Sequence, residues 1–145
     1  MILTFRKLLT NIPDENQESI KKFAKLDDSI QVLLADILVR YVVAGELKVS
    51  SKTIEFNHNR YGKPFLKGNY RLYFNVSYSG NWIVCAIDDE PVGITIEKIR
   101  PIEFEIFKQF LSGEEHKMLM AKNPENLQVF FFDLWTLKES YIKAI

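Results

Sequence analysis

The chain has few of the residues that build covalent or metal-held frameworks, with one cysteine and two histidines among 145 residues. A single thiol excludes an intrachain disulfide. Cys85 lies in an apolar run, which favours a buried and unreactive thiol. His58 and His116 are far apart and belong to no ligand-spaced cluster, so a zinc site is not expected.

The chain also lacks net charge, with 19 basic residues against 19 acidic ones. No overall field favours nucleic acid or an acidic membrane, so neither is expected as a partner, and a charged ligand must be bound locally. Residues 1–9 are too short and too interrupted by charge for a signal peptide or a membrane span. We therefore expect a cytoplasmic protein.

Apolar residues are plentiful: 47% of the chain is hydrophobic, and eleven phenylalanines contribute to an aromatic content of 13%. This composition and length suffice for one domain with a packed core. Because no linker, repeat or low-complexity segment interrupts the chain, residues 1–145 are interpreted as a single domain.

Two helices are predicted in the first third. Pro13 begins a polar helix that reaches about Ala24 and has acidic residues in its first turn. Asp27 or Asp28 can cap the second helix, and Gly45 is expected to end it. Its apolar residues recur at helical spacing and predict a core-facing stripe made of Ile30, Leu33, Leu34, Ile37, Leu38 and Tyr41.

The middle of the chain has the composition of strands, predicted at residues 53–57, 71–77, 82–88 and 92–97. Turn residues at 79–81 and 89–91 make the last three strands antiparallel neighbours. Helices then close the chain. Phenylalanines from Phe104 mark the first, Ser112 with Glu115 forms a capping box for the second, and Pro124 begins a third whose apolar pattern still runs at Ile145.

Two segments carry acidic residues at suggestive spacing. In residues 92–97, alternation places Gly93, Thr95 and Glu97 on one face, while Val92, Ile94 and Ile96 face the core. On the last helix, Trp135, Glu139 and Lys143 follow one another at four-residue intervals and form one stripe.

Each feature also has an ordinary structural interpretation. Glu97 can be a solvated acid or a partner of Lys98 or Arg100, and Thr95 suits a half-buried strand. Glu139 and Lys143 can form an exposed helical ion pair contributing about 0.3–0.5 kcal/mol. The segment 62–64, Gly-Lys-Pro, is a common turn in which Pro64 keeps Lys63 extended.

Taken together, four segments in this order resemble the 4'-phosphopantetheinyl transferases of the Sfp type: Gly-Lys-Pro at 62–64, Asn-Val-Ser-Tyr-Ser-Gly at 75–80, Val-Gly-Ile-Thr-Ile-Glu at 92–97, and Trp-Thr-Leu-Lys-Glu at 135–139 followed by Lys143. The resemblance runs from about Ile20 to the last residue. It implies transfer of phosphopantetheine from coenzyme A to a serine of an acyl or peptidyl carrier protein, with Mg²⁺, as in holo-acyl-carrier-protein synthases.

The resemblance also implies residue roles. Glu97 and Glu139 match two magnesium ligands, and Thr95 occupies the position of a third ligand, which is an aspartate in the family. Glu139 is further implied as the general base for the carrier serine, and Lys143 as the cation on the pyrophosphate. Coenzyme A contacts are implied for Lys63, Pro64, Ser77, Tyr78 and Lys143, with Tyr78 replacing a histidine.

The implied fold is α+β: the first half of the transferase fold, an antiparallel sheet packed by a long helix, plus the opening helices of the second half. We expect the rear of that second, pseudo-symmetric half to be missing. Three hypotheses follow: a magnesium-dependent transferase impaired by Thr95 and by truncation, a catalytically inactive remnant that binds coenzyme A or carrier protein, and an α+β domain whose acids and lysines only decorate its surface. In this family the position of Gln31 tends to hold an arginine. Arg60, Lys63, Lys67 and Arg71 form a local basic cluster in the sequence that can compensate for its absence, but for most of them a solvated face is the favoured interpretation.

Overall fold

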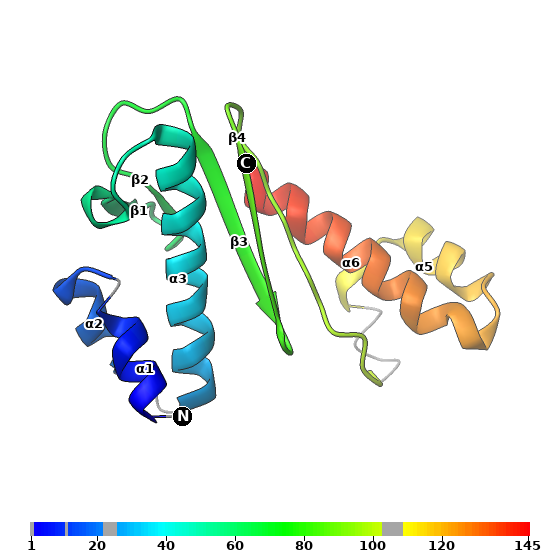
Figure 1. The fold of residues 1–145 in the computed structure, drawn as a ribbon. Helices are drawn as coiled ribbons and strands as arrows, with labels where there is room; N and C mark the ends of the chain where they lie inside the picture. Colours follow the sequence, from blue (N-terminus) through cyan, green and yellow to red (C-terminus); the bar gives the residue numbers. More distant parts are fainter. Residues whose placement is uncertain (1, 11, 22–25, 103–108) are drawn as a thin grey trace.

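The computed structural model describes all of the chain except residues 1, 11, 22–25 and 103–108. Three helices come first, followed by two short β-hairpins, and further helices end the chain (Figure 1). The elements are α1 (Ile2–Leu9), α2 (Asp14–Lys21), α3 (Leu26–Leu47), β1 (Phe56–His58), β2 (Pro64–Leu66), β3 (Tyr73–Ser79), β4 (Trp82–Asp88), α5 (Gly113–Met120) and α6 (Leu127–Ala144), with 3₁₀ turns at Ser51–Thr53 and Pro124–Asn126. The mixture of helices and antiparallel strands confirms the predicted α+β class.

The hairpin of β3 and β4 lies between α3 and α6 (Figure 1). The two strands pair antiparallel from Tyr73 opposite Asp88 to Ser79 opposite Trp82, as the turn at 79–81 predicted. Gly80 turns the chain with a φ of 58°, a conformation that glycine adopts without steric cost. Phe74 faces α3 and joins Val39 and Val43 in the principal core. Because side chains alternate along a strand, Asn75, Ser77 and Ser79 face the opposite side, towards α6.

Helix α3 is longer than the sequence predicted. Asp27 and Asp28 lie within it instead of capping it, and it continues past Gly45 to Leu47. It ends at Lys48, which has a left-handed φ of 55°, while the amide of Val49 donates to the carbonyl of Ala44 at 3.1 Å. This is a Schellman closure with lysine in the position usually held by glycine. The expectation that Gly45 ends the helix is therefore wrong.

The first hairpin differs from the prediction as well. The predicted strand at 53–57 is a 3₁₀ turn followed by β1, which pairs with the unpredicted β2 from Phe56 opposite Leu66 to His58 opposite Pro64. Each of these strands has only three residues, too few for an alternation of apolar and polar residues to be recognised in the sequence. At the other end of the chain, helix α1 was not predicted, and Leu9 packs with Ile12, Ile20 and Leu33 in a second apolar cluster.

Residues 92–97 were predicted to form a third strand beside β4, and this prediction is wrong: the structure assigns no strand there. Their amides instead bond to side chains of β3. Ile94 donates to Asn75 Oδ1 at 2.9 Å, Ile96 to Ser77 Oγ at 3.2 Å, and Lys98 to Ser79 Oγ at 3.0 Å. Each step of two residues along β3 corresponds to a step of two residues along the segment 92–98. The segment therefore runs parallel to β3, across the face of the strand that points away from α3.

Helix α6 closes over this segment at Gly93. A Cβ atom at that position would lie 1.9 Å from the carbonyl oxygen of Ser140 and 2.7 Å from the amide nitrogen of Ala144. Only glycine permits so close an approach of the two backbones. The order of layers is therefore α3, the β3–β4 hairpin, residues 92–98 and α6.

The C-terminal helices follow the sequence prediction more closely. Ser112 and Glu115 form the expected capping box of α5, with both reciprocal hydrogen bonds present. Pro124 begins a 3₁₀ turn, and α6 starts at Leu127. Phe131 and Phe132 are buried against Leu119, with Trp135 packed at the edge of the cluster. The helix predicted from Phe104 lies mostly outside the described residues.

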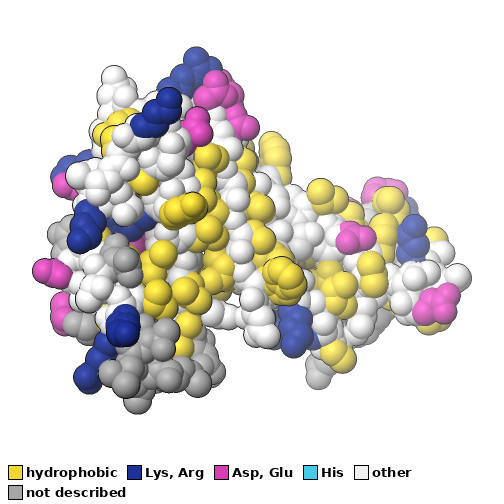
Figure 2. Space-filling view, viewed as in Figure 1, with side chains coloured by type: hydrophobic (Ala, Val, Ile, Leu, Met, Phe, Trp, Pro, Cys, Tyr) yellow, Lys and Arg dark blue, Asp and Glu magenta, His cyan; other side chains and the backbone are white. Residues whose placement is uncertain are grey.

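Apolar side chains are also found on the surface. Figure 2 shows them over the hairpin and along α6, where Leu137, Tyr141 and Ile142 are more than half exposed. A search of the described residues finds no helix that combines the length and the apolar character needed to cross a membrane.

Candidate functional site

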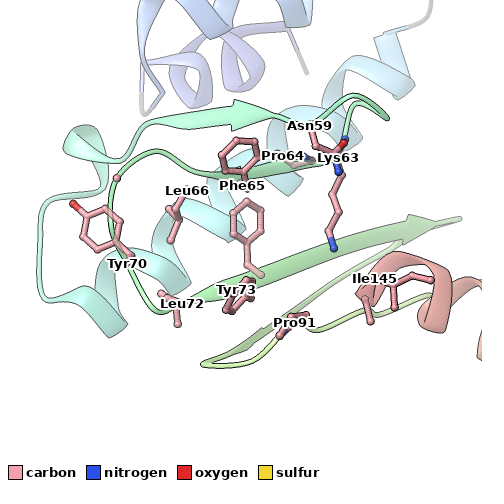
Figure 3. Close-up of a pocket in the computed structure, with 13 residues that line it drawn as sticks. Asn59, Lys63, Pro64, Phe65, Leu66, Tyr70, Leu72, Tyr73, Pro91 and Ile145 are labelled. Atoms are coloured by element: carbon pink, nitrogen blue, oxygen red, sulfur yellow. The ribbon is translucent and has the colours of Figure 1, made fainter.

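The turn at 62–64 aims Lys63 at the end of α6. The Asn59 Oδ1 atom accepts the amides of Tyr61 and Lys63 at 2.9 and 3.0 Å, and Gly62 adopts a φ of 80°. This network fixes the loop between β1 and β2. Figure 3 shows the Lys63 side chain crossing from this loop towards Ile145, along a cavity of 380 Å³ that is also lined by Pro91 and Ala144.

The Lys63 ammonium donates a hydrogen bond to the carbonyl of Lys143. A cation in this position complements the negative end of the α6 dipole. Burial lowers the pKa of Lys63 below its ordinary value, because desolvation disfavours the charged form. The loop of the first hairpin and the last turn of the chain are thus joined at one ammonium group.

Lys143 extends in turn towards β3. Its Nζ atom lies 3.4 Å from Ser77 Oγ and 3.4 Å from the carbonyl oxygen of Ile94. Three predicted site residues, Lys63, Ser77 and Lys143, are thereby brought together from three distant parts of the chain. Among the described residues, neither lysine forms an ion pair with a carboxylate.

Glu97 lies on the same side of β3 as Lys143, beside Ser79, which is two residues beyond Ser77 in the strand. Its Oε2 atom accepts a hydrogen bond from Ser79 Oγ at 2.9 Å, not from Lys98 or Arg100. The Glu97 side chain also lines a cavity that contains Trp135. Residues 93–97 and α6 therefore run antiparallel, with Gly93 near Ser140 and Glu97 near Trp135.

Glu139 lies one helical turn from Trp135 and one from Lys143, on the stripe that the sequence predicted. It is half-buried. Thr95 lies between Ile94 and Glu97 in the facing segment, and its Oγ1 atom is buried without a hydrogen-bond partner. Across the described ranges, no three acidic, histidine or cysteine side chains cluster closely enough to hold a metal ion by themselves.

Tyr78 does not join this group. It projects from β3 towards α3 and lines a different cavity, of 430 Å³, together with Asn16, His58 and Phe74. Pro64 and Phe74 line both cavities. Gln31 donates to the carbonyl of Gly80 at 2.6 Å and so holds the turn of the second hairpin against α3.

Three of the four basic residues, Arg60, Lys67 and Arg71, are exposed, as the solvated-face interpretation predicted, and they do not form a joint anion site. Lys67 pairs with Glu55 at 2.6 Å, and Arg71 pairs with Glu90 at 2.9 Å. Arg60 lies over the ring of Tyr61. Apart from Lys63, these cations are each engaged locally, by a neighbouring carboxylate or ring.

Sequence reasoning missed two contributors, Asn75 and Ser79, whose side chains hold residues 92–98. A signal was present: polar residues at 75, 77 and 79 occupy one face of a strand whose other face is apolar. The polar face of a strand is ordinarily exposed to water. The sequence pattern alone therefore does not distinguish a polar face that bonds to another segment from one that is solvated.

Two family models match the chain and together cover nearly all of it. The model described as 4'-phosphopantetheinyl transferase, N-terminal, matches residues 3–90. The model of the 4'-phosphopantetheinyl transferase superfamily matches residues 91–145. Their boundary falls at Pro91, where β4 has ended and the segment over β3 begins.

Individual proteins agree with these models. The chain is 38% identical over 137 residues to the 4'-phosphopantetheinyl transferase Sfp of Bacillus subtilis, covering 94% of this chain and 61% of that protein. It is 39% identical over 141 residues to the transferase gsp of Aneurinibacillus migulanus, covering 97% and 59%. A mouse L-aminoadipate-semialdehyde dehydrogenase-phosphopantetheinyl transferase is 32% identical over 151 residues. The chain thus spans about three fifths of the length of its bacterial relatives, and it belongs to the 4'-phosphopantetheinyl transferase superfamily.

Proposed function

We propose that this chain carries the donor-binding and acidic part of an enzyme that transfers 4'-phosphopantetheine from coenzyme A to a serine of an acyl or peptidyl carrier protein. The observation that supports this most directly is the convergence of Lys63, Ser77 and Lys143 beside the segment that contains Glu97. The proposal retains the single domain and the cytoplasmic location expected from the sequence.

The two lysines fit an anionic donor. Both ammonium groups lie near oxygen atoms of neutral groups, and neither is neutralised by a carboxylate among the described residues. A pyrophosphate entering beside Lys143 would replace weak contacts of 3.4 Å with charge-assisted hydrogen bonds. The nucleotide end of the donor then has two neighbouring cavities that share Pro64 and Phe74, one lined by Lys63 and the other by Tyr78.

The acidic residues fit a magnesium ion that arrives with phosphate oxygens. Magnesium is usually held by one or two carboxylates, waters and substrate phosphates, so Glu97 and Glu139 meet its minimum. Thr95 places a buried hydroxyl without a partner in the same segment, where it could accept a bond from a metal-bound water. When bound, the ion would neutralise charge that develops on the pyrophosphate oxygens.

The side chains carry out the remaining steps of the proposed transfer. Glu139 takes the proton of the carrier serine hydroxyl as that oxygen attacks the phosphorus nearer to the pantetheine arm. The bond between this phosphorus and the bridging oxygen breaks, and the nucleotide departs as adenosine 3',5'-bisphosphate. Lys143 stabilises the charge that the departing phosphate gains. One phosphodiester bond forms as the pyrophosphate bond is lost, and one proton passes to Glu139.

One observation favours a second candidate function, a remnant that binds coenzyme A or carrier protein without catalysis. Thr95 supplies no charge where the resemblance implies an aspartate, and no three-acid cluster exists among the described residues. The lysine contacts are unaffected by this change, so binding can persist where turnover does not.

A carrier-loading assay separates the two candidates. The full chain is incubated with apo carrier protein, coenzyme A and Mg²⁺, and mass spectrometry detects the phosphopantetheine increment on the carrier. We expect an increment from the native chain, a larger one from Thr95→Asp, and none from Glu139→Gln. If neither the native chain nor Thr95→Asp produces it, catalysis is excluded. Calorimetric titration with coenzyme A then decides whether the binding function remains.

A further inference from the structure

We propose that Asn75, Ser77 and Ser79 form a side-chain ladder that sets the register of residues 92–98, and that Ser79 is the positioning residue for Glu97. The inference about Glu97 deepens the proposed transferase function and rests on it. The inference about register stands on the hydrogen bonds alone.

The ladder has three rungs at regular spacing. Asn75 Oδ1, Ser77 Oγ and Ser79 Oγ accept the amides of residues 94, 96 and 98 at 2.9, 3.2 and 3.0 Å. Asn75 and Ser77 are each only 7% exposed. Ile94 and Ile96 are half-buried, and a backbone amide removed from water requires an acceptor. The side chains of β3 supply these acceptors.

A ladder of this kind specifies register in a way that a backbone ladder does not. Backbone carbonyls are alike at every residue, so a strand can slip without changing the chemistry of its bonds. Here the acceptors differ, since the asparagine oxygen stands one bond further from its backbone than a serine oxygen does. A slip of two residues would leave the amide of Ile94 or of Lys98 without its acceptor and would move Glu97 away from Ser79.

The last two rungs also differ in what they do with the hydroxyl group. Ser79 Oγ accepts from the amide of Lys98 and donates its proton to Glu97 Oε2 at 2.9 Å. Ser77 Oγ accepts from the amide of Ile96 and receives Lys143 Nζ at 3.4 Å. Side chains two residues apart on one strand face stand about 7 Å from each other. The strand therefore holds the proposed cation and the proposed carboxylate at a fixed spacing.

Amide exchange tests the register. In native-state hydrogen exchange followed by NMR, Asn75→Ala should accelerate the amide of Ile94, Ser77→Ala that of Ile96, and Ser79→Ala that of Lys98, each by at least about tenfold. The other two rungs should change far less in each variant. Ser112→Ala is the matched control: it removes a similar serine-to-amide bond at α5 and should leave all three amides unchanged. If every variant accelerates the three amides together, or none does, the register proposal is overturned.

A second measurement tests Ser79 as a positioning residue. Side-chain couplings of Glu97 report whether it keeps one rotamer. We expect one rotamer in the native chain and in Ser79→Thr, which keeps the hydroxyl, and averaging in Ser79→Ala. In the carrier-loading assay, Ser79→Ala should lower kcat by about tenfold or more while KM for coenzyme A stays within about twofold, and Ser79→Thr should restore kcat. Unchanged couplings in Ser79→Ala would refute the positioning role whether or not the chain is active. Altered couplings in a chain without transfer would leave the ladder intact and remove only the proposed function.

Discussion

Gly93 lies so close to α6 that a methyl group replacing its hydrogen would fall 1.9 Å from the carbonyl oxygen of Ser140. The obstacle is backbone and cannot rotate away. The glycine of the segment 92–97 is thus explained by packing, since it lets the helix that carries Glu139 and Lys143 lie directly on the segment that carries Glu97.

Replacing this glycine should detach α6 from the sheet. We expect Gly93→Ala to lower the free energy of unfolding by about 2–3 kcal/mol, as overpacking at a rigid contact does. Urea denaturation followed by tryptophan fluorescence measures it. Gly45→Ala is the control: it lies in α3 with no atom within 4 Å of the added Cβ, and it should stabilise the chain by about 0.5–1 kcal/mol. Equal effects of the two substitutions would contradict the packing role.

Lys143 should control affinity for the donor. Lys143→Met keeps the aliphatic stem and removes the charge, which is worth about 1.5–3 kcal/mol in a bond to an ionised group. Calorimetric titration should therefore show coenzyme A binding weakened by about ten- to a hundredfold. Lys138→Met is the matched control on the same helix. Lys138 bonds to Glu115 at 2.8 Å, so its loss should lower stability and leave affinity for coenzyme A unchanged. A Lys143→Met variant that binds as tightly as the native chain would remove this residue from the donor site.

At Thr95, substitutions that stabilise the metal-free chain should not be those that improve metal binding. Its buried hydroxyl has no partner, so Thr95→Val, of nearly the same volume, should stabilise the metal-free chain by about 1 kcal/mol. Thr95→Asp should destabilise that chain, because it buries a second carboxylate in the segment of Glu97. Added Mg²⁺ with coenzyme A should raise Tm more for Thr95→Asp than for the native chain. A loss of stability in Thr95→Val would mean that the hydroxyl has a partner.

The sequence predicted the parts of this fold that repeat a pattern over many residues. The hairpin of β3 and β4 and the capping box at Ser112 each depend on spacing within one segment. The core-facing stripe predicted on α3 is wrong in part: Leu33 is buried, but Tyr41 is 77% exposed and Leu34 is 36% exposed, and Val39 and Val43 pack in the core in their place. The predictions that failed depend on contacts between segments. Residues 92–97 alternate like a strand, yet the amides of Ile94 and Ile96 bond to the side chains of Asn75 and Ser77.

In the candidate site, too, the features that depend on one segment were predictable and those that depend on contacts between segments were not. The stripe of Trp135, Glu139 and Lys143 follows from helical geometry, and the approach of Lys143 to Ser77 accords with the predicted roles. The separation of Tyr78 from Ser77 was also available from strand alternation, since adjacent residues face opposite ways. The role of Ser79 could not be predicted, because a serine offers the same hydroxyl to water as to a carboxylate.

The lowered pKa of Lys63 predicts a dependence of stability on pH. Burial disfavours the charged ammonium in the folded chain, so the folded pKa lies below the ordinary value of 10.5. Between those two values the unfolded chain binds more protons than the folded one, and stability must rise with pH. The cost of burying the charge is fully present below the folded pKa and fades above it. Relative to Lys63→Met, which has no such group, the native chain should gain stability in urea denaturation as the pH rises towards 10.5.

The same shift predicts proton uptake when an anionic ligand binds. A phosphate near Lys63 favours the ammonium form and should raise the lowered pKa again. In the alkaline range where Lys63 of the free folded chain has lost part of its proton, binding of coenzyme A to the native chain should therefore take up protons, and Lys63→Met should take up fewer. Calorimetry in two buffers of different ionisation enthalpy measures the number of protons. If both chains take up equal numbers, Lys63 does not face the ligand, and its ammonium serves only to hold the last turn of α6 through the carbonyl of Lys143.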